Sequence, residues 1–195
     1  MGLGRWGVVF LCASAFARQP FKFEDLKKLI ETNDLRSVEA VLPHLPLPLR
    51  SHFTLMKNSV SQQESDPLHP RAILYGDDAR FIVTFGGHPA YESFQTLETA
   101  EFVEPRKEVE LREIVFSAGN PARFSEINPH QCTTCHRTPA RYVWPEYLTW
   151  ERAYGEDDDK IQSGSGEYES LRPPQPQSQA GAKSPAYLAL GLNFR

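Results

Sequence analysis

The stretch Arg71-Ala72-Ile73-Leu74-Tyr75-Gly76-Asp77-Asp78-Ala79-Arg80-Phe81-Ile82-Val83-Thr84-Phe85 is the clearest indication of how this 195-residue chain folds. Phe81, Val83 and Phe85 recur at every second position, which is the period of a β-strand with one buried face. The cluster at 76–78 has the composition of a turn, and the run before it is apolar. Two strands joined by a short turn predict an antiparallel hairpin.

Two further runs, 91–97 and 109–116, predict strands that extend the hairpin into an antiparallel meander. In the second run the apolar phase changes between Leu111 and Ile114. This change indicates either a β-bulge or a strand that is buried on both faces.

Helices are predicted on both sides of the meander. Upstream, apolar residues recur at helical spacing from Phe23 to Ile30, and Asp34 is the predicted N-cap of a second short helix. Downstream, Pro145 suits the first turn of a helix, whose aromatic face is formed by Trp144, Tyr147, Trp150 and Tyr154. That face either packs into the core or forms a wall for a prosthetic group. The predicted class is α+β: short N-terminal helices, an antiparallel β-meander and a C-terminal helical segment that carries the functional site.

The first 17 residues predict a secretory signal peptide. Arg5 supplies a basic start, an apolar run follows over 6–16, and cleavage is expected after Ala17. This run is shorter than the ~18 to 20 apolar residues that span a bilayer, and no other segment is a candidate. Lipid attachment at Cys12 is disfavoured by the bulky Leu11 before it. The chain is therefore expected to be exported to the periplasm without a transmembrane segment.

The remaining boundaries follow from composition. Residues 18–155 form the predicted α+β domain. Residues 156–185 are first acidic and then rich in Pro, Ser and Gln, which predicts disorder. Residues 186–195 form a short apolar tail that either docks back or leads into further chain. The net charge of −4 becomes more negative when Arg5 is removed, which makes nucleic acid a poor partner.

The strongest candidate for a functional motif is Cys132-Thr133-Thr134-Cys135-His136. Two thiols separated by two residues can add to the two vinyl groups of one haem, and the following imidazole can ligate its iron. Cys132 and Cys135 are also the only cysteines left after loss of Cys12. Two other interpretations remain: a thiol-disulfide site, which lacks the expected βαβ context, and a structural zinc site, which lacks a second cysteine pair.

The motif resembles the haem-attachment site of c-type cytochromes. Over roughly residues 50–155, the runs 53–56 and 71–81 together with the motif look like uncharacterised exported bacterial proteins that have a β-rich domain before a single haem motif. The resemblance implies one covalent haem c, attached to Cys132 and Cys135, with His136 as the proximal iron ligand. A weaker likeness of Tyr142-Val143-Trp144 to the cytochrome P460 group suggests an alternative β-rich fold.

Neither Met nor His follows His136, so a conventional distal ligand must come from upstream. Met56 is the only methionine of the mature chain, and His88 lies in a Gly86-Gly87-His88-Pro89 loop; both remain candidates. The predicted function is that of an exported mono-haem c-type cytochrome that transfers one electron, more as a carrier than as a catalyst. The alternative is a haem enzyme or small-ligand sensor with an open distal site. The redox partner or ligand is not indicated.

Overall fold

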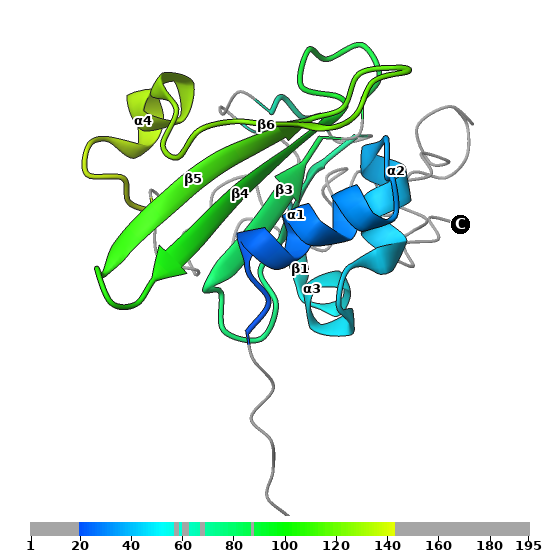
Figure 1. The fold of residues 1–195 in the computed structure, drawn as a ribbon. Coiled ribbons are helices and arrows are strands. Elements are labelled where there is room, and N and C mark those ends of the chain that lie inside the picture. Colours follow the sequence, from blue (N-terminus) through cyan, green and yellow to red (C-terminus); the bar gives the residue numbers. More distant parts are fainter. Residues whose placement is uncertain (1–19, 57–58, 60–62, 67–68, 87, 143–195) are drawn as a thin grey trace, which may run out of the picture.

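The computed structural model describes residues 20–56, 59, 63–66, 69–86 and 88–142 (Figure 1). In chain order, the elements of this part are α1 (Phe23–Thr32), α2 (Val38–Val41), the 3-10 helix η1 (Leu42–His44), α3 (Leu47–Ser51), β1 (Phe53–Met56), β2 (Arg71–Leu74), β3 (Phe81–Phe85), β4 (Thr96–Val103), β5 (Glu108–Val115), β6 (Arg123–Phe124) and α4 (His130–His136). None of the helices in these ranges is long and apolar enough to cross a membrane.

The six strands form one antiparallel sheet in which each strand pairs with its neighbours in sequence. The hairpin predicted over 71–85 is confirmed, because β2 pairs with β3 and Leu74 lies opposite Val83. Its turn needs Gly76, which has a positive φ of 63° and lies against Leu49. The tight turn brings the two apolar strands together.

The β4–β5 pair explains the phase change in the sequence. Its register is continuous from Thr96 opposite Val115 to Val103 opposite Glu108, so this strand pair contains no bulge. Leu111 belongs to the apolar cluster on one face of the sheet and Ile114 to the cluster on the other. Of the two alternatives, β5 is the strand buried on both faces.

The helices α1 to α3 cover one face of the sheet, and α4 lies on the other (Figure 1). Helix α1 forms because Phe23, Leu26 and Ile30 share one side and are all buried, and because Asp25 accepts a hydrogen bond from the Lys22 backbone N–H at 3.0 Å. The helices that follow it are short. Pro43 comes just after α2 in the first turn of η1, and Pro46 and Pro48 lie at the N-cap and in the first turn of α3. The sheet is therefore the largest single element of the described residues.

The predicted fold class is wrong. The described part of the chain is mainly a six-stranded antiparallel sheet with a few short helices, and within it the predicted C-terminal helical segment is not seen. The motif instead lies on α4, a helix of seven residues that packs against the sheet and has its C-cap at Arg137, where φ is 68°. This positive φ lies outside the helical region, so it ends α4 at His136. The aromatic run over 144–154 lies outside the described residues.

Two other local predictions are also wrong. The segment 91–95 is not a strand: Phe94 N–H bonds to the Tyr91 carbonyl at 3.0 Å in a turn, and β4 begins only at Thr96. The second helix begins at Val38, because Ser37 caps it by accepting a bond from Ala40 N–H at 3.1 Å. The predicted signal peptide (1–17), disordered segment (156–185) and apolar tail (186–195) lie outside the described residues.

Candidate functional site

The motif helix α4 is held on the sheet by the residues just before it. Asn128 bonds to Leu111 of β5 twice: its side-chain oxygen accepts from the Leu111 N–H at 2.8 Å, and its own N–H donates to the Leu111 carbonyl at 2.8 Å. Pro129 occupies the N-cap. Within the helix, the Thr134 hydroxyl donates to the His130 carbonyl at 2.9 Å. The position of α4 is thus fixed by the hydrogen bonds between Asn128 and Leu111 of β5.

His136 is oriented by a backbone carbonyl. Its Nδ1 lies 2.8 Å from the carbonyl oxygen of Arg141, and the Arg141 N–H donates to the His136 carbonyl at 3.1 Å. A carbonyl only accepts, so Nδ1 is the donor in this bond, and in the neutral ring the lone pair is then on Nε2. A hydrogen bond of this kind fixes the ring of a metal-ligating histidine and increases the basicity of the other nitrogen. The side chain is therefore prepared to bind a metal through Nε2.

The two cysteines of the motif differ in environment. Cys135 is exposed, whereas Cys132 is half-buried against the sheet with Sγ 3.7 Å from Oε1 of Glu113. Burial, and then the negative charges of Glu113 and Glu98, raise the pKa of the Cys132 thiol to about 12. Cys132 is therefore a neutral thiol near pH 7.

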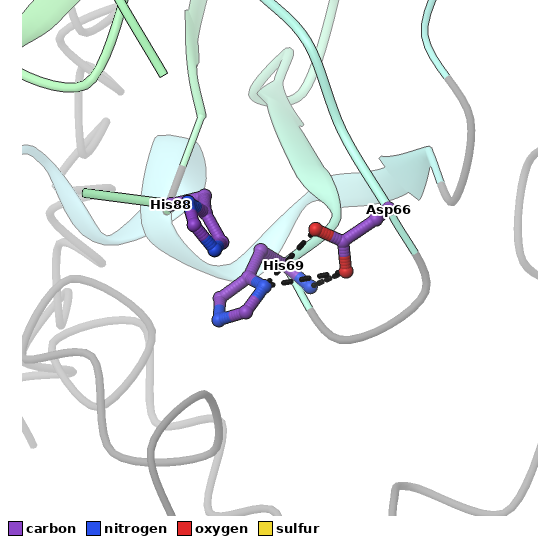
Figure 2. Close-up of side chains that lie close together, drawn as sticks. All are labelled: Asp66, His69 and His88. Atoms are coloured by element: carbon purple, nitrogen blue, oxygen red, sulfur yellow. Dashed lines mark hydrogen bonds and ion pairs between the residues drawn. The ribbon is translucent and has the colours of Figure 1, made fainter. Parts of the chain in front are cut away.

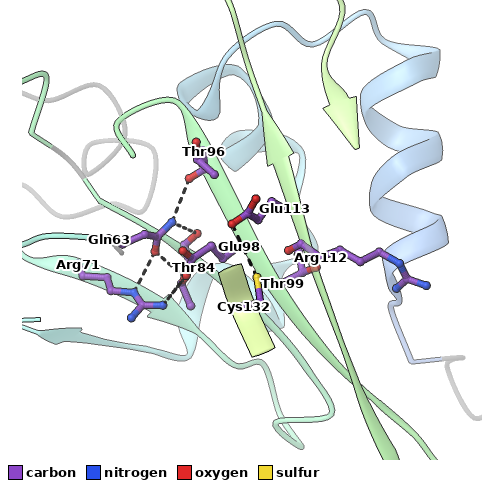
Figure 3. A network of polar contacts seen from close by, with 9 residues as sticks. All are labelled: Gln63, Arg71, Thr84, Thr96, Glu98, Thr99, Arg112, Glu113 and Cys132. Carbon is purple, nitrogen blue, oxygen red and sulfur yellow. Dashed lines mark hydrogen bonds and ion pairs between the residues drawn. The ribbon is translucent and has the colours of Figure 1, made fainter. Parts of the chain in front are cut away.

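A row of polar side chains crosses three strands beneath the motif (Figure 3). Thr84 lies opposite Glu98, and Glu98 lies opposite Glu113, so that two carboxylates are neighbours on adjacent strands. Glu113 accepts a bond from Nε2 of Gln131 on α4 at 2.7 Å. The row therefore brings negative charge directly under the helix that carries the cysteines.

Arg71 balances part of this charge. One of its terminal nitrogens donates to Glu98 and to the Thr84 hydroxyl, each at 2.9 Å, and its Nε donates to Gln63 at 2.9 Å (Figure 3). Burial raises the pKa of Glu98. Arg71 and His136 lower this pKa, and the negative charge of Glu113 raises it further. The partly buried Arg71–Glu98 ion pair therefore interacts electrostatically with His136 of the motif.

An apolar cluster surrounds the polar row on the same face. Its buried members are Ile73, Ile82, Ala100, Val109, Leu111 and Ala140, and partly buried side chains pack against it: Met56, Tyr75, Phe102, Cys132 and Tyr142. Burial, and then Asp78 and Glu101, raise the pKa of the Tyr142 hydroxyl to about 12. The face that carries the motif therefore offers apolar side chains suited to the ring of a haem as well as buried charges.

The structure separates the two predicted distal ligands. Met56, on β1, packs against the same apolar cluster as Cys132. His88 instead contacts His69 and Tyr91, with ring centroids 4.2 Å and 4.6 Å away. Its Nδ1 accepts a bond from the Ala90 N–H at 3.0 Å. Of the two candidates, Met56 is the one grouped with the motif.

Sequence reasoning missed Arg71, Glu98 and Glu113 as parts of the site. Each lies in a strand, but their meeting depends on strand register, which no local pattern reveals. The only sequence signal is that Glu98 interrupts the otherwise β-prone run of β4. The chain matches no protein-family model, and it has no significant similarity to a curated protein or to a solved structure.

Proposed function

We propose that this chain is an exported protein that binds one haem c covalently through Cys132 and Cys135, uses His136 as axial ligand and transfers single electrons. The observation that carries the proposal is the hydrogen bond between His136 Nδ1 and the Arg141 carbonyl at 2.8 Å. It leaves Nε2 available as a metal ligand, in the residue that directly follows two cysteines at haem-attachment spacing.

The residues around the motif fit such a group. Haem has a large apolar ring, and the face below α4 supplies buried Ile73, Ile82 and Leu111 with Met56 and Phe102 beside them. Bound haem would supply iron that alternates between the ferric and ferrous states. The chain itself would orient the axial imidazole through Arg141 and place the Glu98 and Glu113 carboxylates close to the site. Negative charge stabilises the ferric state, so these residues favour a low reduction potential.

The geometry disfavours the interpretations without haem. A thiol-disulfide enzyme needs a reactive thiolate, whereas burial and two carboxylates raise the pKa of Cys132 to about 12. A structural zinc site needs four ligands. Among the described residues, the one group of three or more ligand side chains near enough to hold a metal contains none of Cys132, Cys135 and His136.

A redox titration followed by visible spectroscopy tests electron transfer. We expect a one-electron Nernst curve for protein matured with haem, and a higher potential for Glu113→Gln, because a charge beside the site is lost. Glu108→Gln, on the same strand with a side chain 53% exposed, is the matched control and should leave the potential unchanged. A potential that is equal in wild type and Glu113→Gln would contradict the proposed electrostatic role.

Carbon monoxide binding separates electron transfer from the alternative of a sensor or enzyme. A methionine ligand excludes carbon monoxide from reduced iron, so the wild type should resist it, Met56→Ala should bind it, and His88→Ala should behave like the wild type. Rapid binding by the wild type, with a high-spin spectrum beforehand, would support an open distal site instead.

A further inference from the structure

Two histidines and an aspartate lie close together near the start of β2 and the end of β3. None of them belongs to the motif at 132–136. Asp66, His69 and His88 each present a ligand atom, and these atoms lie within 4.8 Å of one another (Figure 2). All three side chains are partly buried. We propose that Asp66, His69 and His88 bind a divalent transition-metal ion of the Zn²⁺ class, separate from the haem.

The backbone brings Asp66 and His69 together. His69 N–H donates to the Asp66 carbonyl at 3.1 Å and to Oδ1 of its carboxylate at 3.0 Å, and the two residues form an isolated antiparallel bridge. The Tyr91 hydroxyl donates to Oδ2 of the same carboxylate at 2.9 Å. Asp66 is thus held in place from two directions before any metal binds.

The separation of the first two ligand atoms suits a shared ion. His69 Nδ1 lies 3.1 Å from Asp66 Oδ2. Two atoms bound to one Zn²⁺ at about 2.1 Å, with an angle between 90° and 110°, are about 3.0–3.4 Å apart. In the metal-free protein a proton on Nδ1 fills this gap. A metal ion can take the place of that proton with little movement of either side chain.

His88 completes the group. Its ring meets the edge of the His69 ring at a centroid distance of 4.2 Å and an interplanar angle of 87°. Because Nδ1 of His88 accepts a bond from the Ala90 N–H at 3.0 Å, Nε2 is its metal-binding atom. Two imidazoles and one carboxylate favour zinc, nickel or copper over calcium or magnesium, which prefer oxygen ligands.

The test is isothermal titration of Zn²⁺ alone into the chelator-treated full chain that carries Cys132→Ala and Cys135→Ala, so that neither thiol of the motif competes. We expect one ion per chain, with the affinity reduced at least about tenfold by His69→Ala or His88→Ala, since each removes one of three ligands. Tyr91→Phe, which removes a hydrogen bond to the Asp66 carboxylate, should weaken binding by about tenfold.

His52→Ala is the matched control. His52 Nδ1 also lies 3.1 Å from an aspartate oxygen, that of Asp77, but this exposed pair has no third ligand in the described part of the chain. Its removal should leave Zn²⁺ affinity unchanged. No Zn²⁺ binding by the starting protein, or an equal loss in His52→Ala and His88→Ala, would overturn the proposal.

A second measurement needs no histidine variant, so it tests the site even if those variants fail to fold. In imidazole NMR spectra of the same Cys132→Ala, Cys135→Ala chain, Zn²⁺ should shift the signals of His69 and His88 and leave those of His52 and His44 in place. Shifts spread equally over all histidines would contradict a defined site. Neither measurement involves haem, so failure of the metal site leaves the haem proposal untouched.

Discussion

The two faces of the sheet differ in what they bury. The face under α1 to α3 is lined mainly by apolar side chains, among which Val83, Phe85 and Leu97 are each 0% exposed. The polar groups buried on this face pair locally, as Arg112 does with Glu110 beside Phe23 of α1. The face under α4 carries an apolar cluster too, but a row of polar groups crosses it, of which Thr84 is buried and the others are partly buried: Arg71, Thr84, Glu98 and Glu113. Buried charge is a weak source of stability. The first face therefore accounts for the fold, and the second indicates function.

The largest expected effect comes from the helix-covered face. Phe85→Ala removes a fully buried ring, and such a change typically costs about 3–5 kcal/mol through lost burial and the cavity left behind. Urea unfolding measures it. Leu47→Ala, at a side chain whose residue is 65% exposed, is the control and should change the free energy of unfolding by less than about 0.5 kcal/mol. Equal effects would contradict the division between the two faces.

The next effect concerns the buried ion pair. Arg71→Met leaves the Glu98 carboxylate without its cation and should lower the free energy of unfolding by about 3 kcal/mol at pH 7. Arg80→Met is the matched control, because Arg80 pairs with Asp78 and Glu104 at 51% side-chain exposure; it should cost less than about 1 kcal/mol. The double change Arg71→Met, Glu98→Gln should recover most of the loss.

The stability lost in Arg71→Met should increase as the pH rises. Burial raises the pKa of Glu98 in the folded protein, so the folded state binds the proton more tightly than the unfolded state does. In Arg71→Met, where the cation that lowers this pKa is gone, the pKa of Glu98 is raised further. The variant should be closest to wild type below about pH 4.3, the ordinary pKa of glutamate, and should lose stability as the pH rises through the raised folded pKa. A difference that grows toward acid pH would contradict this assignment.

The smallest effect concerns the thiols before haem attachment. At pH 8, iodoacetamide should modify the exposed Cys135 well before Cys132, whose raised pKa of about 12 keeps it a thiol. Glu113→Gln should accelerate modification of Cys132 severalfold, since it removes one charge and leaves the larger effect of burial. Peptide mass spectrometry measures both rates, with Glu108→Gln as control. Faster modification of Cys132 than of Cys135 would instead support a redox thiol.

The sequence predicted what local patterns determine. Strict alternation at Phe81, Val83 and Phe85 identified the hairpin, and the spacing from Phe23 to Ile30 identified α1. Strand β4 was placed wrongly because the polar residues Thr99, which is buried, and Glu98, which is partly buried, stand where a hydrophobic pattern is expected. Their partners, Arg71 and the carbonyl of Arg112, are distant in sequence. Such strands cannot be recognised without the register of the sheet.

Of the candidate site, the sequence predicted the cysteines and the histidine of the motif but not the residues that surround them. The motif named Cys132, Cys135 and His136, and a metal-ligating imidazole generally has a hydrogen-bond acceptor for its other ring nitrogen. That Arg141 supplies it depends on the turn after α4, which closes on the His136 carbonyl at 3.1 Å. The grouping of His88 with Asp66 and His69 depends in the same way on loops that meet only in the folded chain.

The central claim is the covalent haem, and denaturation of matured protein tests it most directly. The full chain is produced with a c-type maturation system, unfolded and extracted with acidified acetone, and the remaining polypeptide is mapped by mass spectrometry. The account predicts haem retained on the peptide that contains Cys132 and Cys135, and loss of attachment when both are alanine. Haem that extracts freely from the wild type, or a chain that never acquires it, would contradict the account.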